Sequence, residues 1–168
     1  MQLQEIDKVI YRRRLNRITL TIITAMLLLA IGSSTLLIEL LGTPEKSNFW
    51  FNLTGVILAA LIVGYTLYRT RHSEYLKEVW YTWQLKQELN RIYRKSAKLK
   101  AAMDLNDINA LIIMNFNLRG SVQLYELDDN DLTLVELKQE LKEFEKKLEE
   151  LGVNISTDDY RTELLSTL

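Results

Sequence analysis

Two long runs without a charged residue constrain this chain more than any other feature. One extends from Ile18 to Ile38 and the other from Ser47 to Tyr68. At a helical rise of about 1.5 Å per residue, each run is long enough to cross the roughly 30 Å hydrocarbon layer of a bilayer. A chain of 168 residues is too small to surround two such helices inside a soluble core. We therefore interpret both runs as transmembrane helices, and the first is longer than the core of a signal peptide.

The distribution of basic residues predicts the orientation of the two spans. Five basic residues lie in positions 1–17 and three lie just after the second run, whereas Lys46 is the only one between the runs. The positive-inside rule then places both termini in the cytoplasm, and the connector from Gly42 to Lys46 becomes a tight outer turn. We expect these residues at the lipid headgroups: Arg12, Arg13, Arg14, Arg17, Arg69 and Arg71.

Small and aromatic residues add detail to this picture of a transmembrane hairpin. Small residues spaced four apart let helix backbones approach closely in lipid, either within the hairpin or between subunits, and the sequence leaves both readings open. On the second span these residues are Gly55 with Ala59 and Ala60 with Gly64. The tryptophans expected at interfaces with the membrane or another subunit are Trp50, Trp80 and Trp83.

The hundred residues after the second span predict a cytoplasmic helical domain. One amphipathic helix is expected from Ser73 to about Met103, and a second from about Asp107 to Tyr125. A third should follow a capping box formed by Thr133 and Glu136. Apolar residues at heptad-like spacing form two seams, which we interpret as assembly surfaces in a coiled-coil-like domain. The seam residues are Leu85, Leu89, Ile92 and Leu99 on the first helix, and Leu134, Leu137, Leu141, Phe144, Leu148 and Leu151 on the third.

The predicted fold class is thus an all-α membrane protein with three parts. They are a basic cytoplasmic N-terminal segment (1–17), a transmembrane hairpin (18–68, spans about 18–41 and 47–68) and a cytoplasmic helical domain (69–168). Net charge differs sharply along the chain, from +6 over residues 69–103 to −9 over residues 104–168. Either the basic and acidic helices pair through their seams, which we favour, or the basic helix lies along anionic headgroups.

Catalytic and metal-binding chemistry has little support in the sequence. The absence of cysteine excludes disulfides, thiolate metal sites and cysteine nucleophiles. His72 is the only histidine and lies next to the second span, where an interfacial role is the simpler interpretation. The acidic stretch at 128–131 lacks the pattern of a calcium loop and is typical of a turn that caps a helix. We expect no enzyme activity, no metal, no cofactor and no nucleic-acid partner.

Several short motifs in the chain resemble those of one protein family. They are LNR at 15–17, SNFW at 47–50, WQLK at 83–86, LNRIYRK at 89–95, NALII at 109–113 and QLYELDDN at 123–130. Over most of its length the chain resembles an uncharacterised bacterial family of short two-span inner-membrane proteins of unknown function. The resemblance implies a bacterial inner membrane and carries no catalytic motif.

These observations predict a non-enzymatic, membrane-anchored helical module for assembly or scaffolding. Its partners would be membrane lipids together with further copies of the chain or another protein, bound through the cytoplasmic heptad helices. The alternative is a subunit of a small oligomeric channel or transporter. In that case hydroxyl and amide side chains of the spans would line a pore, although such hydroxyls more often bond to their own helix.

Overall fold

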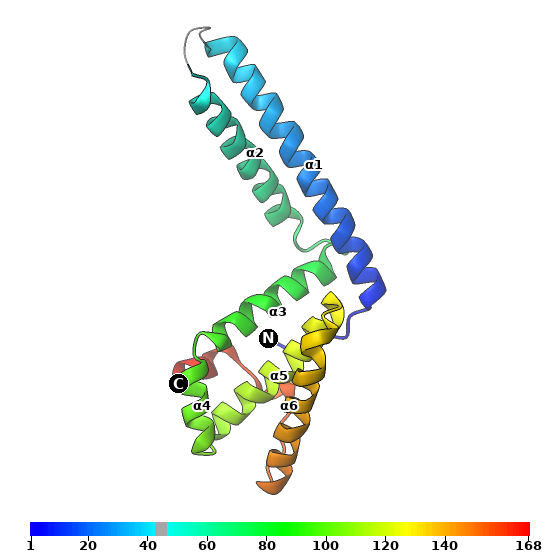
Figure 1. Ribbon diagram of the computed structural model, residues 1–168, viewed down its shortest axis with the longest axis vertical. Coiled ribbons are helices and arrows are strands. Elements are labelled where there is room, and N and C mark those ends of the chain that lie inside the picture. Colours follow the sequence, from blue (N-terminus) through cyan, green and yellow to red (C-terminus); the bar gives the residue numbers. More distant parts are fainter. Residues whose placement is uncertain (43–46) are drawn as a thin grey trace. The chain divides into compact units, whose positions relative to one another are not determined.

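The computed structural model describes residues 1–42 and 47–168. Helices make up 80% of the chain and no strand occurs in these two ranges, which confirms the predicted all-helical fold class (Figure 1). In chain order, the elements are α1 (Lys8–Leu41), α2 (Phe49–Thr70), α3 (Lys77–Tyr93), α4 (Ser96–Asp104), α5 (Ile108–Asp128), α6 (Asp131–Glu150) and the 3-10 helices η1 (Thr157–Asp159) and η2 (Thr162–Thr167).

Helices α1 and α2 are both long and apolar enough to cross a membrane. Their surfaces carry exposed large apolar side chains, such as Leu28 (69% exposed) and Leu61 (64% exposed). Helix α1 begins at Lys8, ten residues before the predicted span, so the basic segment is itself helical. Residues 43–46, the main part of the predicted outer turn, lie outside the described residues.

The chain divides into two compact units. One unit consists of residues 13–80 and holds most of α1 and all of α2. The other combines residues 1–12 with residues 81–168. The N-terminal segment therefore belongs to the same unit as the helical domain, although the two are far apart in sequence. The sequence patterns did not predict this union.

Within the first unit, α1 and α2 run side by side (Figure 1). They pack closely where α2 has a glycine. A Cβ atom added to Gly55 would lie 2.9 Å from the carbonyl oxygen of Ala30 and from the backbone nitrogen of Ser34. The hydroxyl of Ser33 donates a hydrogen bond to the carbonyl oxygen of Gly55 at 3.2 Å, and the hydroxyl of Ser34 donates one to Asn52. Backbone proximity, rather than interlocking large side chains, thus holds these two helices together.

The prediction of one continuous helix from Ser73 to Met103 is wrong. Helix α3 starts at Lys77 and ends at Tyr93. Helix α4 starts at Ser96, after a turn at residues 94–95. The break coincides with Ser96, the polar residue that interrupts the apolar seam. Because no apolar side chain secures the seam there, the chain can turn, and Leu99 of α4 still joins the same core as Leu85 of α3.

Helix α5 forms the centre of the helical domain. Its residues Ile113 and Phe116 pack with the seam of α3, whereas Leu111 and Leu118 pack with Phe144 and its neighbours on α6. At 100° per residue these two pairs lie on different faces of α5. The seams of α3 and α6 are therefore each covered by α5, and the preferred direct pairing of the basic and acidic helices is not the arrangement found within the chain.

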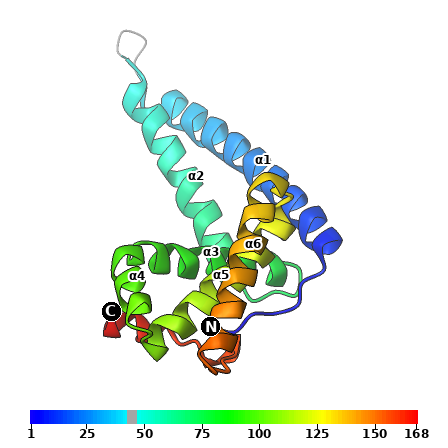
Figure 2. The ribbon, with the colours of Figure 1, turned by 60° about the horizontal axis from the view of Figure 1, so that its bottom comes forward.

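The ends of α5 and α6 show which sequence signals operate locally. Asp107 caps α5 as predicted, and its carboxylate accepts a hydrogen bond from the amide of Ala110 at 2.9 Å. The predicted capping box at Thr133 is wrong, because α6 already starts at Asp131 and Asn130 makes no side-chain cap. The C-terminal helix η2 lies beside α4 (Figure 2).

Candidate functional site

The first seven residues are not helical, and they lie in a groove between α3 and α5. We define this docking groove by five residues: Tyr81, Leu85 and Leu89 of α3, with Gly120 and Gln123 of α5. The apolar side chains of the N-terminal segment pack on the same core as Leu85, and they are Met1, Leu3 and Ile6. Sequence periodicity gave no signal for this docking, because these residues are separated by polar ones.

Two side chains of the docking groove bind the backbone amide and the backbone carbonyl of Gln4. The amide of Gln4 donates a hydrogen bond to the hydroxyl oxygen of Tyr81 at 2.9 Å, and the carbonyl oxygen of Gln4 accepts one from the side-chain amide of Gln123. The Tyr81 hydroxyl in turn donates to Gln123 at 2.8 Å. Burial raises the pKa of Tyr81, so the hydroxyl keeps the proton that this network needs. Non-helical backbone is thereby satisfied without a strand partner.

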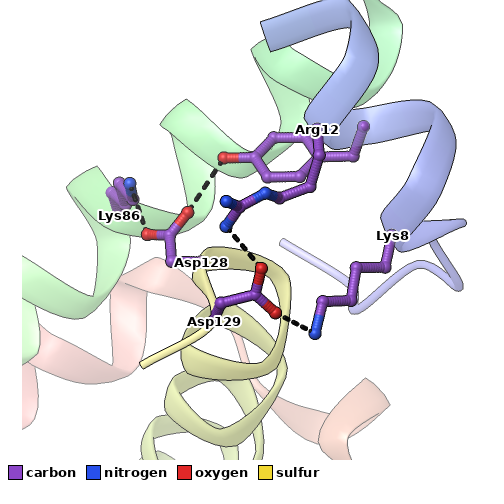
Figure 3. Close-up of polar contacts among 6 residues, drawn as sticks. Lys8, Arg12, Lys86, Asp128 and Asp129 are labelled. Carbon is purple, nitrogen blue, oxygen red and sulfur yellow. Dashed lines mark hydrogen bonds and ion pairs between the residues drawn. The ribbon is translucent and has the colours of Figure 1, made fainter. Parts of the chain in front are cut away.

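A charged cluster fixes the start of α1 to the end of α5 (Figure 3). Lys8 and Arg12, one helical turn apart, both pair with the carboxylate of Asp129, Arg12 at 2.9 Å. Asp128 pairs with Lys86 of α3 at 2.9 Å and accepts a hydrogen bond from the hydroxyl of Tyr11 at 3.2 Å. One helix end, with Asp129 in the left-handed conformation (φ 56°), thus contacts both α1 and α3.

The electrostatics of this cluster follow from burial and from the neighbouring charges. Burial, together with the negative charge of Asp128, raises the pKa of Tyr11 to about 12. The hydrogen bond from Lys8 and the charge of Arg12 lower the pKa of Asp129. Near neutral pH Asp129 is therefore negatively charged, and Tyr11 is a neutral hydrogen-bond donor.

Cavities lie on both sides of the N-terminal segment. A cavity of about 500 Å³ is lined by Gln2 and Gln4 on one side and by α3 residues that include Gln87 and Arg91 on the other. A second cavity of about 340 Å³ separates Leu3, Gln4 and Glu5 from α5 and from Leu141 of α6. The segment is thus anchored at a few points and is not tightly enclosed along its length.

The C-terminal tail is anchored to α3 by a buried carboxylate. Glu88, 5% exposed, accepts hydrogen bonds from the hydroxyls of Tyr160 and Thr162, both at 2.7 Å, and pairs with Arg91 at 3.2 Å. The ring of Tyr160 stacks on Phe116 of α5 with centroids 4.0 Å apart. Burial and the negative charge of Glu88 raise the pKa of Tyr160. Sequence reasoning missed this acid, because a single glutamate on a charged helix gives no signal.

One buried polar group lacks a partner within the described part of the chain. Asn115 of α5 is 1% exposed, and its side-chain nitrogen has no hydrogen-bond acceptor there. Its oxygen accepts a hydrogen bond from Arg119 at 3.0 Å, and Arg119 pairs with Glu145 of α6 at 2.6 Å. Asn115 is therefore a polar residue within the buried part of α5, and only its oxygen has a hydrogen-bond partner.

The residues predicted as assembly seams lie largely in the core of the chain itself. Leu85, Leu89, Ile92 and Leu99 are buried in one cluster, and Phe144 and Leu148 in the other. The other residues of the second predicted seam are less buried. Leu134, Leu137 and Leu141 of α6 are half-buried, and Leu151, just after the end of α6, is exposed.

The two pairs of small residues on α2 have different environments. Gly55 and Ala59 are buried, and Gly55 contacts the backbone of α1. Ala60 and Gly64 are exposed, and a Cβ atom added to Gly64 would meet nothing within 4 Å. The structure shows packing within the hairpin for the first of the two pairs. The first pair packs against α1, and the second pair is uncovered.

The predicted headgroup arginines also divide into two groups. Arg12 pairs with Asp129, while Arg14 pairs with Glu78 and lies over the ring of Tyr75 at 5.5 Å. Arg71 lies over a neighbouring tyrosine ring of its own segment. The exposed members are Arg13, Arg17 and Arg69. Among the predicted interface tryptophans, Trp50 and Trp83 are exposed and Trp80 is half-buried.

No group of three or more histidine, aspartate or glutamate side chains is positioned to hold a metal ion in residues 1–42 and 47–168. The polar clusters that do occur connect helices to one another and to the two chain ends.

Comparison with known proteins identifies the family. No curated protein and no solved structure matches the chain. The match to a family covers residues 1–165, nearly the whole chain. The chain belongs to the family described as a protein of unknown function, DUF3087.

Proposed function

We propose that this protein is a non-enzymatic, membrane-anchored module that self-associates in the bacterial inner membrane. In this proposal α1 and α2 form a transmembrane hairpin with both termini in the cytoplasm, where the helical domain is presented. The observation that carries the proposal is the uncovered small-residue face of α2, formed by Ala60 and Gly64.

Packing in lipid differs from packing in water, which gives this face its meaning. Lipid tails are as apolar as leucine, so helices associate where small residues allow close van der Waals contact. The Gly55 face of α2 shows this principle within the chain, because it brings the backbones of α1 and α2 together. The face at Ala60 and Gly64 has the same spacing and no cover, and a second copy of the hairpin supplies a matching surface.

The buried seams redirect the site of assembly. A seam that already packs against α5 is not free to bind another copy without opening the core. We therefore place the self-association contact in the membrane and assign to the helical domain the role of a folded, attached unit. The buried acid Glu88 supports a structural role for this unit, because two hydroxyls and Arg91 already engage its carboxylate.

The channel alternative receives less support from the hydroxyl groups of the spans. Thr21, Ser33 and Thr54 each donate a hydrogen bond to a carbonyl oxygen of their own helix, four residues earlier. Hydroxyls bonded in this way are satisfied in lipid and do not require a water-filled pore. Conductance of the reconstituted protein in planar bilayers would revive the channel alternative.

The experiment compares three glycine substitutions in purified full-length protein in lipid nanodiscs and in detergent. Gly64→Leu should weaken self-association at least about tenfold, an effect of about 1.4 kcal/mol, because the bulky side chain blocks close approach. Gly32→Leu, also in open space on α1, is the matched control and should leave association unchanged. Gly55→Leu should disrupt α1–α2 packing itself.

Mass photometry over a range of protein-to-lipid ratios gives the oligomeric state. A wild-type protein that remains monomeric at every ratio contradicts the proposal. So does a Gly64→Leu variant that associates as strongly as the wild type.

A further inference from the structure

The helical unit contains two segments of the chain whose covalent connection runs through the other unit. Residues 1–12 and residues 81–168 form one compact unit, and residues 13–80, the other unit, connect them. The docking groove recognises the N-terminal segment through local contacts alone. Those contacts specify the sequence of the segment, and the corresponding segment of any other copy satisfies them equally well.

Three kinds of contact bind the N-terminal segment, and the second and third depend on its sequence. Tyr81 and Gln123 bind the backbone of Gln4, as described above. The side chain of Leu3 reaches the gap left by the missing side chain of Gly120, where an added Cβ would lie 3.6 Å from Leu3. The following residues then supply the charges that pair with Asp129. Together these contacts select a short segment in which apolar residues are followed by the two cations Lys8 and Arg12.

Residues 1–5 of this segment are only partly enclosed, because cavities of about 500 Å³ and 340 Å³ flank them. Tyr11 is 2% exposed, so exchange must release its ring, and Tyr11 of the second copy then fills the same site. The ion pairs of the segment to Asp129 are solvent-accessible, with 47% of that side chain exposed. Exchange replaces each contact with an identical one, so the core that contains Phe116 is covered again by Met1, Leu3 and Ile6 of the second copy.

We propose that the docking groove of one copy binds the N-terminal segment of a second copy, so that two neighbouring chains exchange residues 1–12. The proposal rests on the proposed self-association through α2. Packed helices lie about 8–10 Å apart, so a neighbouring hairpin brings a second N-terminal segment at an effective concentration comparable to the first. Exchange of an identical element keeps every local contact and is a low-cost route to a dimer.

The absence of cysteine permits a clean crosslinking test in the full-length protein in membranes. Glu5 of the segment and Glu126 of α5 both line the cavity of about 340 Å³, and neither forms one of the contacts described above that bind the segment. Two differently tagged chains, one with Glu5→Cys and one with Glu126→Cys, are co-expressed and treated with a short bismaleimide. The matched control replaces Glu126→Cys with Glu149→Cys on the exposed face of α6.

Exchange predicts a crosslinked heterodimer in about half of the dimers, the share that random pairing of the two chains provides. The control pair should give at least tenfold less product. A single chain that carries both Glu5→Cys and Glu126→Cys reports binding within one copy. If this chain yields only an internal crosslink and the co-expressed pair yields none, the segment stays in its own groove and the proposal is overturned. A double-substituted chain with neither product also overturns it, because the segment is then not docked.

Mass photometry of the same samples separates this proposal from the proposed function. Dimers without crosslinks between chains contradict the exchange and leave self-association intact. Absence of dimers, with a strong internal crosslink, contradicts both.

Discussion

The two compact units of this chain solve the problem of helix packing in different ways. In residues 13–80 the helices meet at Gly55 through backbone contacts, and large apolar side chains such as Leu61 point outward. In the unit of residues 1–12 and 81–168, large side chains such as Ile113 and Phe116 are fully buried. The first unit is suited to an apolar solvent, whereas the second carries its own core and is suited to water.

Hydroxyl groups follow the same division, except at Ser33 and Ser34, which bond from α1 to α2. In the first unit, the hydroxyls of Thr54 and Thr66 donate hydrogen bonds to their own helices. In the second unit, hydrogen bonds span long sequence distances, as between Tyr160 and Glu88. A hydroxyl bonded to its own helix needs no partner from another segment, whereas the bond between Tyr160 and Glu88 attaches two distant segments.

Removal of a core aromatic ring should break the comparison most strongly. We expect Phe116→Ala to lower the free energy of unfolding of the helical unit by about 3–5 kcal/mol, because it leaves a cavity and removes the stack on Tyr160. Phe49→Ala, at a residue 59% exposed on α2, is the matched control and should have little effect.

Hydrogen exchange measured by mass spectrometry localises the effect of Phe116→Ala. Faster exchange should be confined to residues 1–12 and 81–168. Equal acceleration in α2 would mean that the two units unfold together, and their distinction would then lose its thermodynamic meaning.

Alkaline pH should destabilise the helical unit selectively. The pKa of Tyr11 is raised to about 12, so the folded state keeps a proton that the unfolded chain loses near pH 10. The stability linked to Tyr11 is thus complete below pH 10 and is lost as pH rises toward 12. The loss is about 2–3 kcal/mol. Chemical denaturation at several pH values, followed by circular dichroism, measures this slope, and Tyr11→Phe should make it shallower. An unchanged slope would contradict the assignment.

A smaller effect tests the hydrogen bond between α1 and α2. Ser34→Ala should weaken α1–α2 packing by about 0.6 kcal/mol, and by no more than about 1.7, as is typical of hydrogen bonds between membrane helices. Thr54→Ala is the control, since that hydroxyl bonds only within α2. The midpoint of denaturation by sodium dodecyl sulfate in mixed micelles reports the difference. Identical midpoints for both variants would show that Ser34 contributes nothing across the interface.

The smallest effect is expected at the charged cluster. Asp129→Asn keeps a residue that tolerates the left-handed conformation, but it removes the charge that pairs with Lys8 and Arg12. Because these groups are solvent-exposed, we expect a small decrease in Tm at low salt that vanishes in 1 M salt, where the Debye length is about 3 Å. A decrease that persists at high salt would indicate that geometry, not charge, holds the cluster.

Local signals in the sequence predicted much of the fold. The uncharged runs predicted α1 and α2, and Asp107 predicted the start of α5. The break between α3 and α4 was missed, because helix periodicity continues on both sides of Ser96. Docking of the N-terminal segment was missed for a related reason. Its apolar residues are too few to form a periodic face, and their burial becomes visible only when the docking groove is known.

By itself the sequence determined which segments are helical and which helices suit lipid, because both properties depend on residues close together in the chain. Tertiary structure decided which faces are covered. Helix α5 packs between the two apolar seams, and the Gly55 face of α2 packs against α1. Ala60 and Gly64 of α2 are exposed. The physical reason is that apolar spacing shows that a face must be buried, while its partner is chosen by the packing of all the helices together.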